Sequence, residues 1–208
     1  MPVRPDREYR SMTMEVREAT DGQEKIVEGY ATIFDQPYLL WQEPGYEIWE
    51  QVDRRAFEGC DMSDVIMQYD HEGRVFARTS NGTLTAEPDD KGLHTVADLG
   101  GTDIGGQLYQ EIKGGYTTKM SYAYRVERDR RETTEDHEAG TVRVLRTIEK
   151  IAKLYDVSAV SLPANDATSI SARSLSEGVI AELREECLAA KARGRQRQKI
   201  KIITEVTK

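Results

Sequence analysis

The chain has 208 residues and a net charge of −8, and 38% of its residues are hydrophobic while 32% are charged. This length suits one well-buried core with or without a tail and excludes two full domains, and the composition is typical of a soluble globular protein. The longest apolar runs span only a few residues, so no segment is expected to cross a membrane. The first twelve residues lack the apolar stretch of a secretory signal, so none is expected.

Charge is unevenly distributed along the chain. Residues 189–208 contain seven lysines and arginines against the single acid Glu205, whereas the rest of the chain is acidic. An acidic body argues against a nucleic-acid enzyme, because phosphate binding requires dense positive charge. We interpret the basic end as a solvated tail, with contact to nucleic acid or an acidic partner as the alternative. Cys60 and Cys187 lack metal-ligand spacing, and we expect two free thiols.

Strand patterns dominate the first part of the chain. Residues 13–17 alternate in polarity, and residues 26–34 form a run of β-branched and aromatic residues, so both are predicted strands. Residues 35–45 contain two prolines and a glycine, which predicts a long loop. Residues 46–52 are the next expected strand. Residues 65–69 have the composition of a buried strand and end directly before Asp-His.

A hairpin is expected after this buried strand. Residues 75–79 and 83–87 both have strand composition, and Asn81-Gly82 between them supplies the positive φ of a tight turn. Residues 92–99 alternate in polarity and are predicted to form a further strand.

One helix interrupts the strand patterns. Apolar residues spaced by four run from Ile104 to Ile112, so they fall on one helical face. Thr102 or Asp103 can cap the start of this helix, and the two glycines after Lys113 end it.

The second half of the chain returns to strands. Residues 117–127 and 141–162 are expected strands, and the charged residues 128–140 between them predict a mobile loop or hairpin tip. Residues 175–192 have the apolar spacing of an amphipathic helix. The pattern indicates a mainly β protein with some α structure, largely antiparallel, as a β-barrel or sandwich with helical additions. We expect a main domain at residues 1–174, followed by a C-terminal helix and basic tail at 175–208.

Histidine is scarce, with only three in the chain. Amide hydrolysis without a metal needs a nucleophile, a base and a group that orients the base, so each histidine is a candidate base. His71 directly follows a strand of buried type, where a rigid element can present a side chain to a cleft. His94 lies within a strand, where we expect a structural or surface role. His137 lies in the charged segment and is expected to be solvated. A structural role for His71 stays open.

Ser121 and Asp156 complete the candidates. Ser121 lies early in a strand between large side chains, where a small hydroxyl leaves room for a ligand; the alternative is a serine that packs in a tight place. Asp156 is a carboxylate inside an otherwise apolar strand, so it needs a partner. An imidazole is one such partner and an arginine is the other. Local chemistry leaves both interpretations open for each residue.

Other chemistries lack their motifs. The sequence contains no HExxH, CxxC, P-loop or GxGxxG pattern, and it has no paired histidines for zinc. The acidic residues within 132–138 lack the ordered spacing of a calcium loop. We therefore expect neither a metal nor a cofactor.

Six segments occur in an order that resembles one known family, the HK97-type prohead maturation proteases of tailed phages. They are EGYATIFDQPY, EIWEQVDRRAF, VIMQYDHEGRVFART, GLHTVADL, KGGYTTKMSYAYRV and LYDVSAVSLPANDAT. The resemblance runs from about Glu28 to about Ala172. Its most specific pieces are the histidine after a hydrophobic strand, the serine in an aromatic strand, and the acid-Val-Ser segment that leads to Pro-Ala-Asn.

This resemblance implies a fold like that of herpesvirus assembly proteases, an antiparallel β-barrel flanked by helices. It also implies a serine endopeptidase with Ser121 as nucleophile, His71 as general base and Asp156 as the third member of a Ser–His–acid triad. Two features depart from the family pattern. Glu usually stands where this chain has Asp156, and the histidine usually precedes its acid, whereas here Asp70 precedes His71.

The resemblance further implies a role in capsid maturation. The expected substrates are the scaffolding segment of the major capsid protein and the protease itself, and the expected place is the prohead interior in the host bacterial cytoplasm. A homo-oligomer fits this role, whereas no membrane and no nucleic-acid partner is expected. The alternative is a non-catalytic scaffold or structural protein of the prohead with the same fold, and Asp156 in place of Glu is the feature that favours it.

Overall fold

The computed structural model describes most of the chain, in the residue ranges 7–13, 25–136, 138, 140–161, 175–186 and 188–189. The chain divides into two compact units, Met1–Ala172 and Arg173–Lys208. In the second unit, residues 175–186 are helical, within the range where an amphipathic helix is expected. The basic tail beyond residue 189 lies outside the described residues, and the domain boundary at 174/175 stays a prediction.

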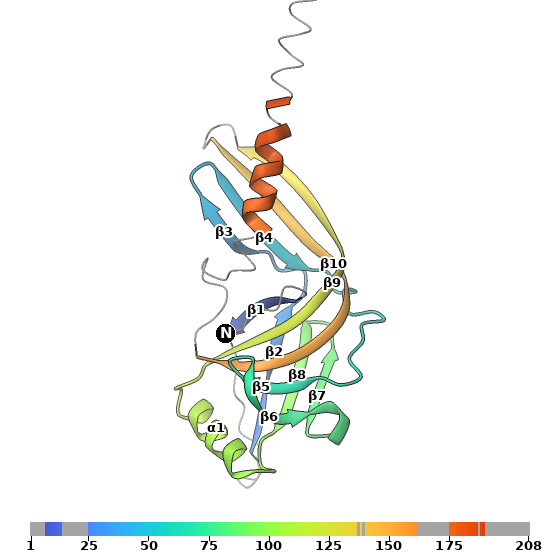
Figure 1. Ribbon diagram of the computed structural model, residues 1–208, viewed down its shortest axis with the longest axis vertical. Helices are drawn as coiled ribbons and strands as arrows, with labels where there is room; N and C mark the ends of the chain where they lie inside the picture. Colours follow the sequence, from blue (N-terminus) through green and yellow to red (C-terminus); the bar gives the residue numbers. More distant parts are fainter. Residues whose placement is uncertain are drawn as a thin grey trace, which may run out of the picture. The chain divides into compact units, whose positions relative to one another are not determined.

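The first unit contains ten described strands and the helix α1 (Figure 1). The strands are β1 (Glu8–Thr13), β2 (Ile26–Ile33), β3 (Tyr38–Glu43), β4 (Tyr46–Val52), β5 (Ile66–Tyr69), β6 (Glu72–Arg78), β7 (Leu84–Pro88), β8 (Gly92–Asp98), β9 (Lys119–Asp136) and β10 (Thr141–Val160). Seven of them form one sheet, with the order β1-β9-β10-β4-β3 and with β5 and β6 joined to β10. The other three form a smaller sheet, β2-β8-β7.

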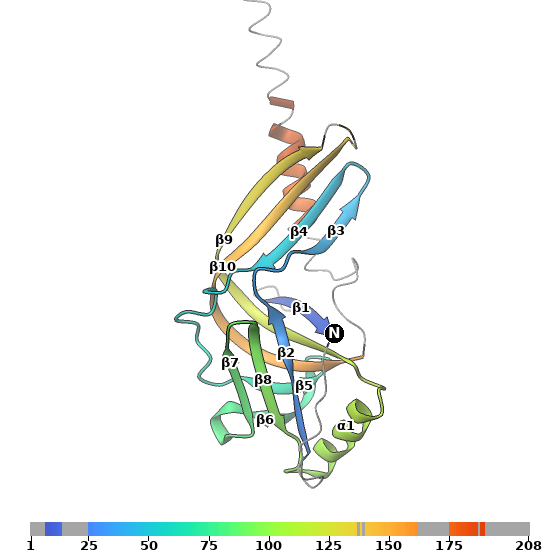
Figure 2. The same cartoon turned by 180° about the vertical axis from the view of Figure 1, so that it is seen from behind.

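The long hairpin β9–β10 runs through the larger sheet and curves along its length (Figures 1 and 2). Residues 142–148 of β10 pair with β4, whereas residues 156–159 of the same strand pair with β5. Four shifts of register interrupt the β9–β10 pairing between residues 148 and 156. Bulges of this kind bend a strand and increase its twist. One hairpin therefore serves two differently oriented parts of the sheet.

The helix α1 (Asp103–Lys113) forms where the sequence predicts it. The hydroxyl of Thr102 accepts a hydrogen bond from the backbone N–H of Gly105 and caps its first turn. Leu108 and Ile112 are buried on its apolar face, and burying a side chain of this size stabilises the fold by about 2 kcal/mol. The helix ends at Gly114, and β9 begins six residues after Lys113.

Side chains from both sheets and from α1 form one buried cluster. β2 and β8 contribute Val27 and Leu93, whereas β9 contributes Tyr122 and Tyr124, whose rings stack 4.6 Å apart. These tyrosines alternate with Ser121 and Ala123 along the strand, so they lie on the opposite face of the sheet. One face of β9 therefore belongs to the core and leaves the other face for Ser121.

The predicted mainly β class with helices is confirmed, but the closed antiparallel barrel is not. In the described part of the chain, strand pairing does not close the two sheets into a barrel. The larger sheet is also mixed, because β10 runs parallel to both β4 and β5. The pattern of single strands cannot reveal this arrangement, since parallel neighbours here come from distant parts of the chain.

Two local predictions are wrong, and a third is right in only one of its alternatives. The expected hairpin of residues 75–79 and 83–87 does not form, because β6 pairs with β5 and β7 pairs with β8; Gly82 instead ends a short 3-10 turn between the two sheets. The expected loop at 35–45 contains β3, which pairs with β4. Of the two alternatives for residues 128–140, the mobile loop is wrong, because β9 continues to Asp136 and cross-strand ion pairs join its charged side chains to β10. The hairpin alternative is confirmed, because β9 and β10 pair antiparallel up to Asp136 and Thr141.

Candidate active site

Ser121 lies on β9, on the face opposite the core tyrosines. It stands directly across from Ser158 of the neighbouring strand β10. Residues paired in this way project from the same face of a sheet. Ser121 has 0% of its surface exposed.

His71 lies in a two-residue turn between β5 and β6. Tyr69 and Glu72 pair across this hairpin, and both turn residues, Asp70 and His71, have positive φ values of 50° and 60°. Two successive positive φ values are the requirement of a tight hairpin turn of type I′, and a residue with a Cβ pays about 1–2 kcal/mol for this conformation. The sequence hides this turn, because neither position is a glycine.

Hydrogen bonds of Asp70 join the strained turn to the end of β10. Its carboxylate accepts hydrogen bonds from the backbone N–H of Ser161 at 2.9 Å and from the Ser161 hydroxyl at 2.8 Å. Its own backbone N–H donates to the carbonyl of Ala159 at 2.9 Å. Strained backbone persists where surrounding contacts over-determine it. These contacts hold His71 over the sheet rather than in solvent.

A bulge in β10 aims Asp156 at the same face. Leu154 pairs with Tyr124, and Asp156 pairs with Ala123. Between these two pairs β10 therefore contains one extra residue that has no partner on β9. Leu154 therefore lies with the core tyrosine, whereas Asp156 lies on the face of Ser121 even though it is only two residues further. Bulges next to functional sites commonly redirect a side chain in this way.

The fold brings the three sequence candidates together. His71 Nε2 lies 2.7 Å from the Oγ atom of Ser121, and His71 Nδ1 is hydrogen bonded to Oδ1 of Asp156. His71 and Asp156 have 8% and 3% of their surfaces exposed. The ring thus bridges a hydroxyl and a carboxylate that come from two neighbouring strands. This arrangement can transfer a proton from the hydroxyl to the imidazole while the carboxylate orients the ring.

Comparison with known proteins identifies the family. Residues 12–179 match the family described as Caudovirus prohead serine protease. The chain belongs to this family. The comparisons find no match to the chain among curated proteins or among solved structures.

Family membership carries several coarse consequences. The chain is a serine peptidase of phage capsid maturation, it interacts with the phage capsid protein, and it acts in the prohead interior inside the host cell. None of the described helices has the length and apolar character that crossing a bilayer requires. The matched range includes all three site candidates.

One wall of the site is an aromatic side chain that the sequence patterns did not predict. The ring of Tyr9, on β1, packs edge-on against the His71 ring with centroids 4.8 Å apart. Tyr9 is itself buried, with 3% of its surface exposed.

A groove of about 560 Å³ adjoins the turn that carries His71. It lies between the β5–β6 hairpin and α1, and it is lined by Tyr69, Asp70, Glu72, Gly73, Arg74, Phe76, Ile104, Gln107, Leu108 and Glu111. Charged and polar side chains make up half of this lining, and aromatic, aliphatic and glycine residues make up the rest. The turn that carries His71 therefore has open space on the side of α1.

The other nucleophile and base candidates lie elsewhere. His94 is half-buried on β8 in the smaller sheet, where its Nε2 hydrogen bonds to Glu28 at 2.8 Å, as a structural histidine does. His137 lies outside the described residues. Burial raises the pKa of Cys60 to about 11, so its thiol stays protonated and weakly nucleophilic at neutral pH. The described residues contain no group of three or more histidine, cysteine or acidic side chains that could hold a metal.

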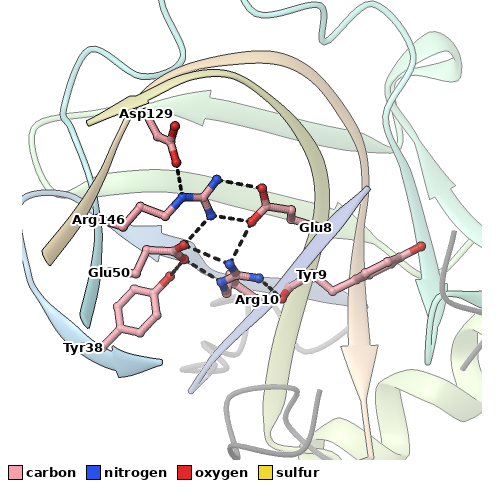
Figure 3. A network of polar contacts seen from close by, with 7 residues as sticks. All are labelled: Glu8, Tyr9, Arg10, Tyr38, Glu50, Asp129 and Arg146. Atoms are coloured by element: carbon pink, nitrogen blue, oxygen red, sulfur yellow. Dashed lines mark hydrogen bonds and ion pairs between the residues drawn. The ribbon is translucent and has the colours of Figure 1, made fainter. Parts of the chain in front are cut away.

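A buried network of ion pairs holds β1 in place (Figure 3). The sequence patterns did not predict it. Arg10 lies across from Tyr122 on the core face of β1, and its guanidinium makes two hydrogen bonds to the Glu50 carboxylate. Arg146 donates to Glu50 at 2.7 Å and to Glu8 at 2.6 and 2.9 Å. Tyr38 and Asp129 complete the network through hydrogen bonds to Glu50 and Arg146.

Electrostatics keeps this network charged. Burial favours the neutral form of Glu50, but Arg10, Arg146 and the Tyr38 hydroxyl outweigh it and lower the Glu50 pKa to about 2. Burial likewise disfavours the Arg10 cation, yet the Glu50 charge raises its pKa well above the ordinary value. Tyr9 directly precedes Arg10 on β1, so its side chain lies on the opposite face of the strand. The network that fixes Arg10 therefore also fixes the Tyr9 ring that packs against His71.

Proposed function

We propose that the chain is an endopeptidase that cleaves the scaffolding segment of the major capsid protein, and itself, through Ser121, His71 and Asp156. The observation that carries this proposal is the hydrogen-bonded series Asp156–His71–Ser121 in a chain of the prohead serine protease family. The separation of 2.7 Å between His71 Nε2 and Ser121 Oγ lies within the reach of proton transfer.

The mechanism follows from the orientation of the His71 ring. With Nδ1–H donating to Asp156, the other nitrogen Nε2 is the one that accepts the Ser121 proton as Oγ attacks the scissile carbonyl. The new C–O bond and the cleavage of the C–N bond give an acyl-enzyme, and His71 returns the proton to the leaving amine. Water then attacks the ester by the same route and restores Ser121. Base catalysis of this kind contributes roughly 10²- to 10⁴-fold.

The shorter acid at position 156 no longer favours a non-catalytic protein. One methylene less reduces the reach of the side chain, but the bulge before Asp156 and the turn at His71 bring the two groups into contact. A scaffold that had lost its activity has no need to keep a buried carboxylate on a buried imidazole, since buried charges are costly. The geometry thus supports the enzyme over the structural alternative.

Co-expression with the capsid protein tests the proposal. We expect the full-length chain to shorten the capsid protein, and Ser121→Ala and His71→Ala to leave it at full length. His94→Ala is the matched control, because it removes a half-buried histidine on the other sheet and should leave cleavage intact. Thermal unfolding of each variant checks that it folds. Identical capsid bands for the unaltered chain and for Ser121→Ala would sink the proposal and favour a structural role.

A further inference from the structure

A second buried serine, Ser158, forms a hydrogen bond with the acid of the site. It lies on β10 two residues after Asp156, and alternate strand residues project from the same face. Its hydroxyl donates a hydrogen bond of 2.8 Å to Oδ1 of Asp156. The same oxygen accepts the hydrogen bond from His71 Nδ1. One carboxylate oxygen therefore receives two donors from different elements.

The environment makes this contact strong and hard to replace. Ser158 has 0% and Asp156 3% of the surface exposed, so water has little access to either group. A hydrogen bond to an ionised acceptor is shorter and roughly twice as strong as one between neutral groups. Losing such a donor at a buried carboxylate costs more than losing it at the surface, since solvent cannot take its place.

Strand pairing adds a second constraint. Ser158 stands directly across from Ser121, so the hydroxyl that holds the acid and the proposed nucleophile share one row of the sheet. Rotation of the Asp156 carboxylate about its side-chain bonds would carry Oδ1 away from His71. The Ser158 donor opposes that rotation, because it binds the oxygen at a fixed place on the same strand.

We propose that Ser158 is a positioning residue for the site: it holds the Asp156 carboxylate in the orientation that His71 requires. It neither contacts the substrate nor transfers a proton, and it acts only through Asp156. This inference rests on the function proposed above. The alternative is that Ser158 is a small buried residue whose hydroxyl donates to the nearest acceptor without affecting the orientation of the Asp156 carboxylate.

A double-mutant cycle separates these two roles. Ser158→Ala should lower kcat for capsid-protein cleavage by roughly 10- to 100-fold, the range for a hydrogen bond to a charged group, and leave KM within about twofold. Ser158→Thr keeps the hydroxyl on a residue that suits strands and should retain most of the activity. In an Asp156→Ala background, Ser158→Ala should change kcat by less than about twofold, because residues that act as a unit are not additive.

The opposing outcomes are equally definite. Wild-type kcat in Ser158→Ala, or the same loss with and without Asp156, would overturn the positioning role. Ser158→Cys keeps the size of the side chain, but its thiol is only a weak donor, so its kcat should fall as in Ser158→Ala. A cysteine variant with wild-type kcat, or a folded threonine variant as poor as alanine, would also overturn the positioning role.

A readout without substrate distinguishes failure of this inference from failure of the proposed function. The proton between His71 Nδ1 and Asp156 should give a far-downfield proton resonance in nuclear magnetic resonance spectra, absent in His71→Ala. Ser158→Ala should shift this resonance, since Oδ1 then accepts one donor instead of two. An unshifted resonance would overturn the inference even in an active enzyme. A shifted resonance in a chain without Ser121-dependent cleavage would support the contact and refute the peptidase mechanism.

Discussion

At Asp156, a single charge is held between two donors in a dry part of the sheet. His71 and Ser158 both bind its Oδ1 atom, and both are buried. In the proposed mechanism, a carboxylate in this place orients the ring so that Nε2 faces Ser121, and it stabilises the positive charge that the ring gains during attack. The contribution that we propose for this acid is orientation and charge, and a substitution that keeps its shape tests the charge separately from packing.

Asp156→Asn is the substitution that removes the charge and keeps the shape. We expect it to lower kcat for capsid cleavage by roughly 10²- to 10⁴-fold, because the amide can no longer balance the His71 cation and favours the wrong ring tautomer. Initial rates of cleavage measure this effect, and thermal unfolding controls for folding. A rate equal to that of the unaltered chain would remove Asp156 from the mechanism.

At the scale of elements, the end of β10 organises the site. Asp156 contacts the His71 ring, the carbonyl of Ala159 accepts from the backbone of Asp70, and Ser161 donates twice to the Asp70 side chain. A turn with two positive φ values needs such support, since its residues are not glycines. The position of His71 thus depends on a residue that we do not expect to take part in the reaction.

Asp70 substitutions test this dependence. Asp70→Ala should lower kcat by roughly 10-fold or more, because a displacement of about 1 Å in a catalytic group is costly. Asp70→Asn should keep most of the activity, because asparagine tolerates positive φ and its amide oxygen still accepts from Ser161. Cleavage rates of the two variants, compared with those of His94→Ala on the other sheet, give the result. Equal activity of Asp70→Ala and the unaltered chain would show that the turn holds itself.

The candidate site residues could be predicted from the sequence, but most of the residues that position them could not. His71, Ser121 and Asp156 each follow or interrupt a strand in a way that attracts notice, and the order of family segments selects them together. Ser158 could have been found, because a residue two positions from a strand acid shares its face. Asp70 and the Arg10–Glu50 pair could not, since these contacts depend on strand pairings between segments far apart in the chain.

The same limit explains the errors in the fold. Asn81-Gly82 has the strongest turn signal in the chain, yet it connects two sheets, whereas Asp70-His71 forms the actual hairpin without a glycine. Local turn chemistry cannot specify which strands pair, because pairing is decided by burial across the sheet. The parallel contacts of β10 with β4 and β5 have no local signal at all.

At the scale of the whole molecule, the buried ion network ties stability to pH. The folded-state pKa of Glu50 is about 2, below its ordinary value of 4.5. A carboxylate with a lowered folded pKa contributes its full stability above its unfolded pKa, and this contribution is lost as the pH falls toward the folded value. We therefore expect the free energy of unfolding to decrease between about pH 4.5 and pH 2 through Glu50.

The comparison of Glu50→Gln with the unaltered chain isolates this effect. At pH 7 the variant should be less stable by about 3–5 kcal/mol, because Arg10 and Arg146 lose a buried partner. The difference should shrink as the pH falls toward 2. Urea unfolding at several pH values measures it, and Asp64→Asn, which breaks an exposed pair with Arg78, is the control with a much smaller effect. A difference that does not change with pH would contradict the role of the Glu50 charge.

Ser121 is the nucleophile of the proposed mechanism, and chemical labelling measures its reactivity directly. A small fluorophosphonate forms an O–P bond with an activated serine and loses fluoride, with His71 accepting the hydroxyl proton. Mass spectrometry of the treated protein should find one adduct, on Ser121, and this adduct should disappear in His71→Ala but persist in His94→Ala. An adduct on another serine, or labelling of Ser121 that is the same without His71, would contradict the proposed active site.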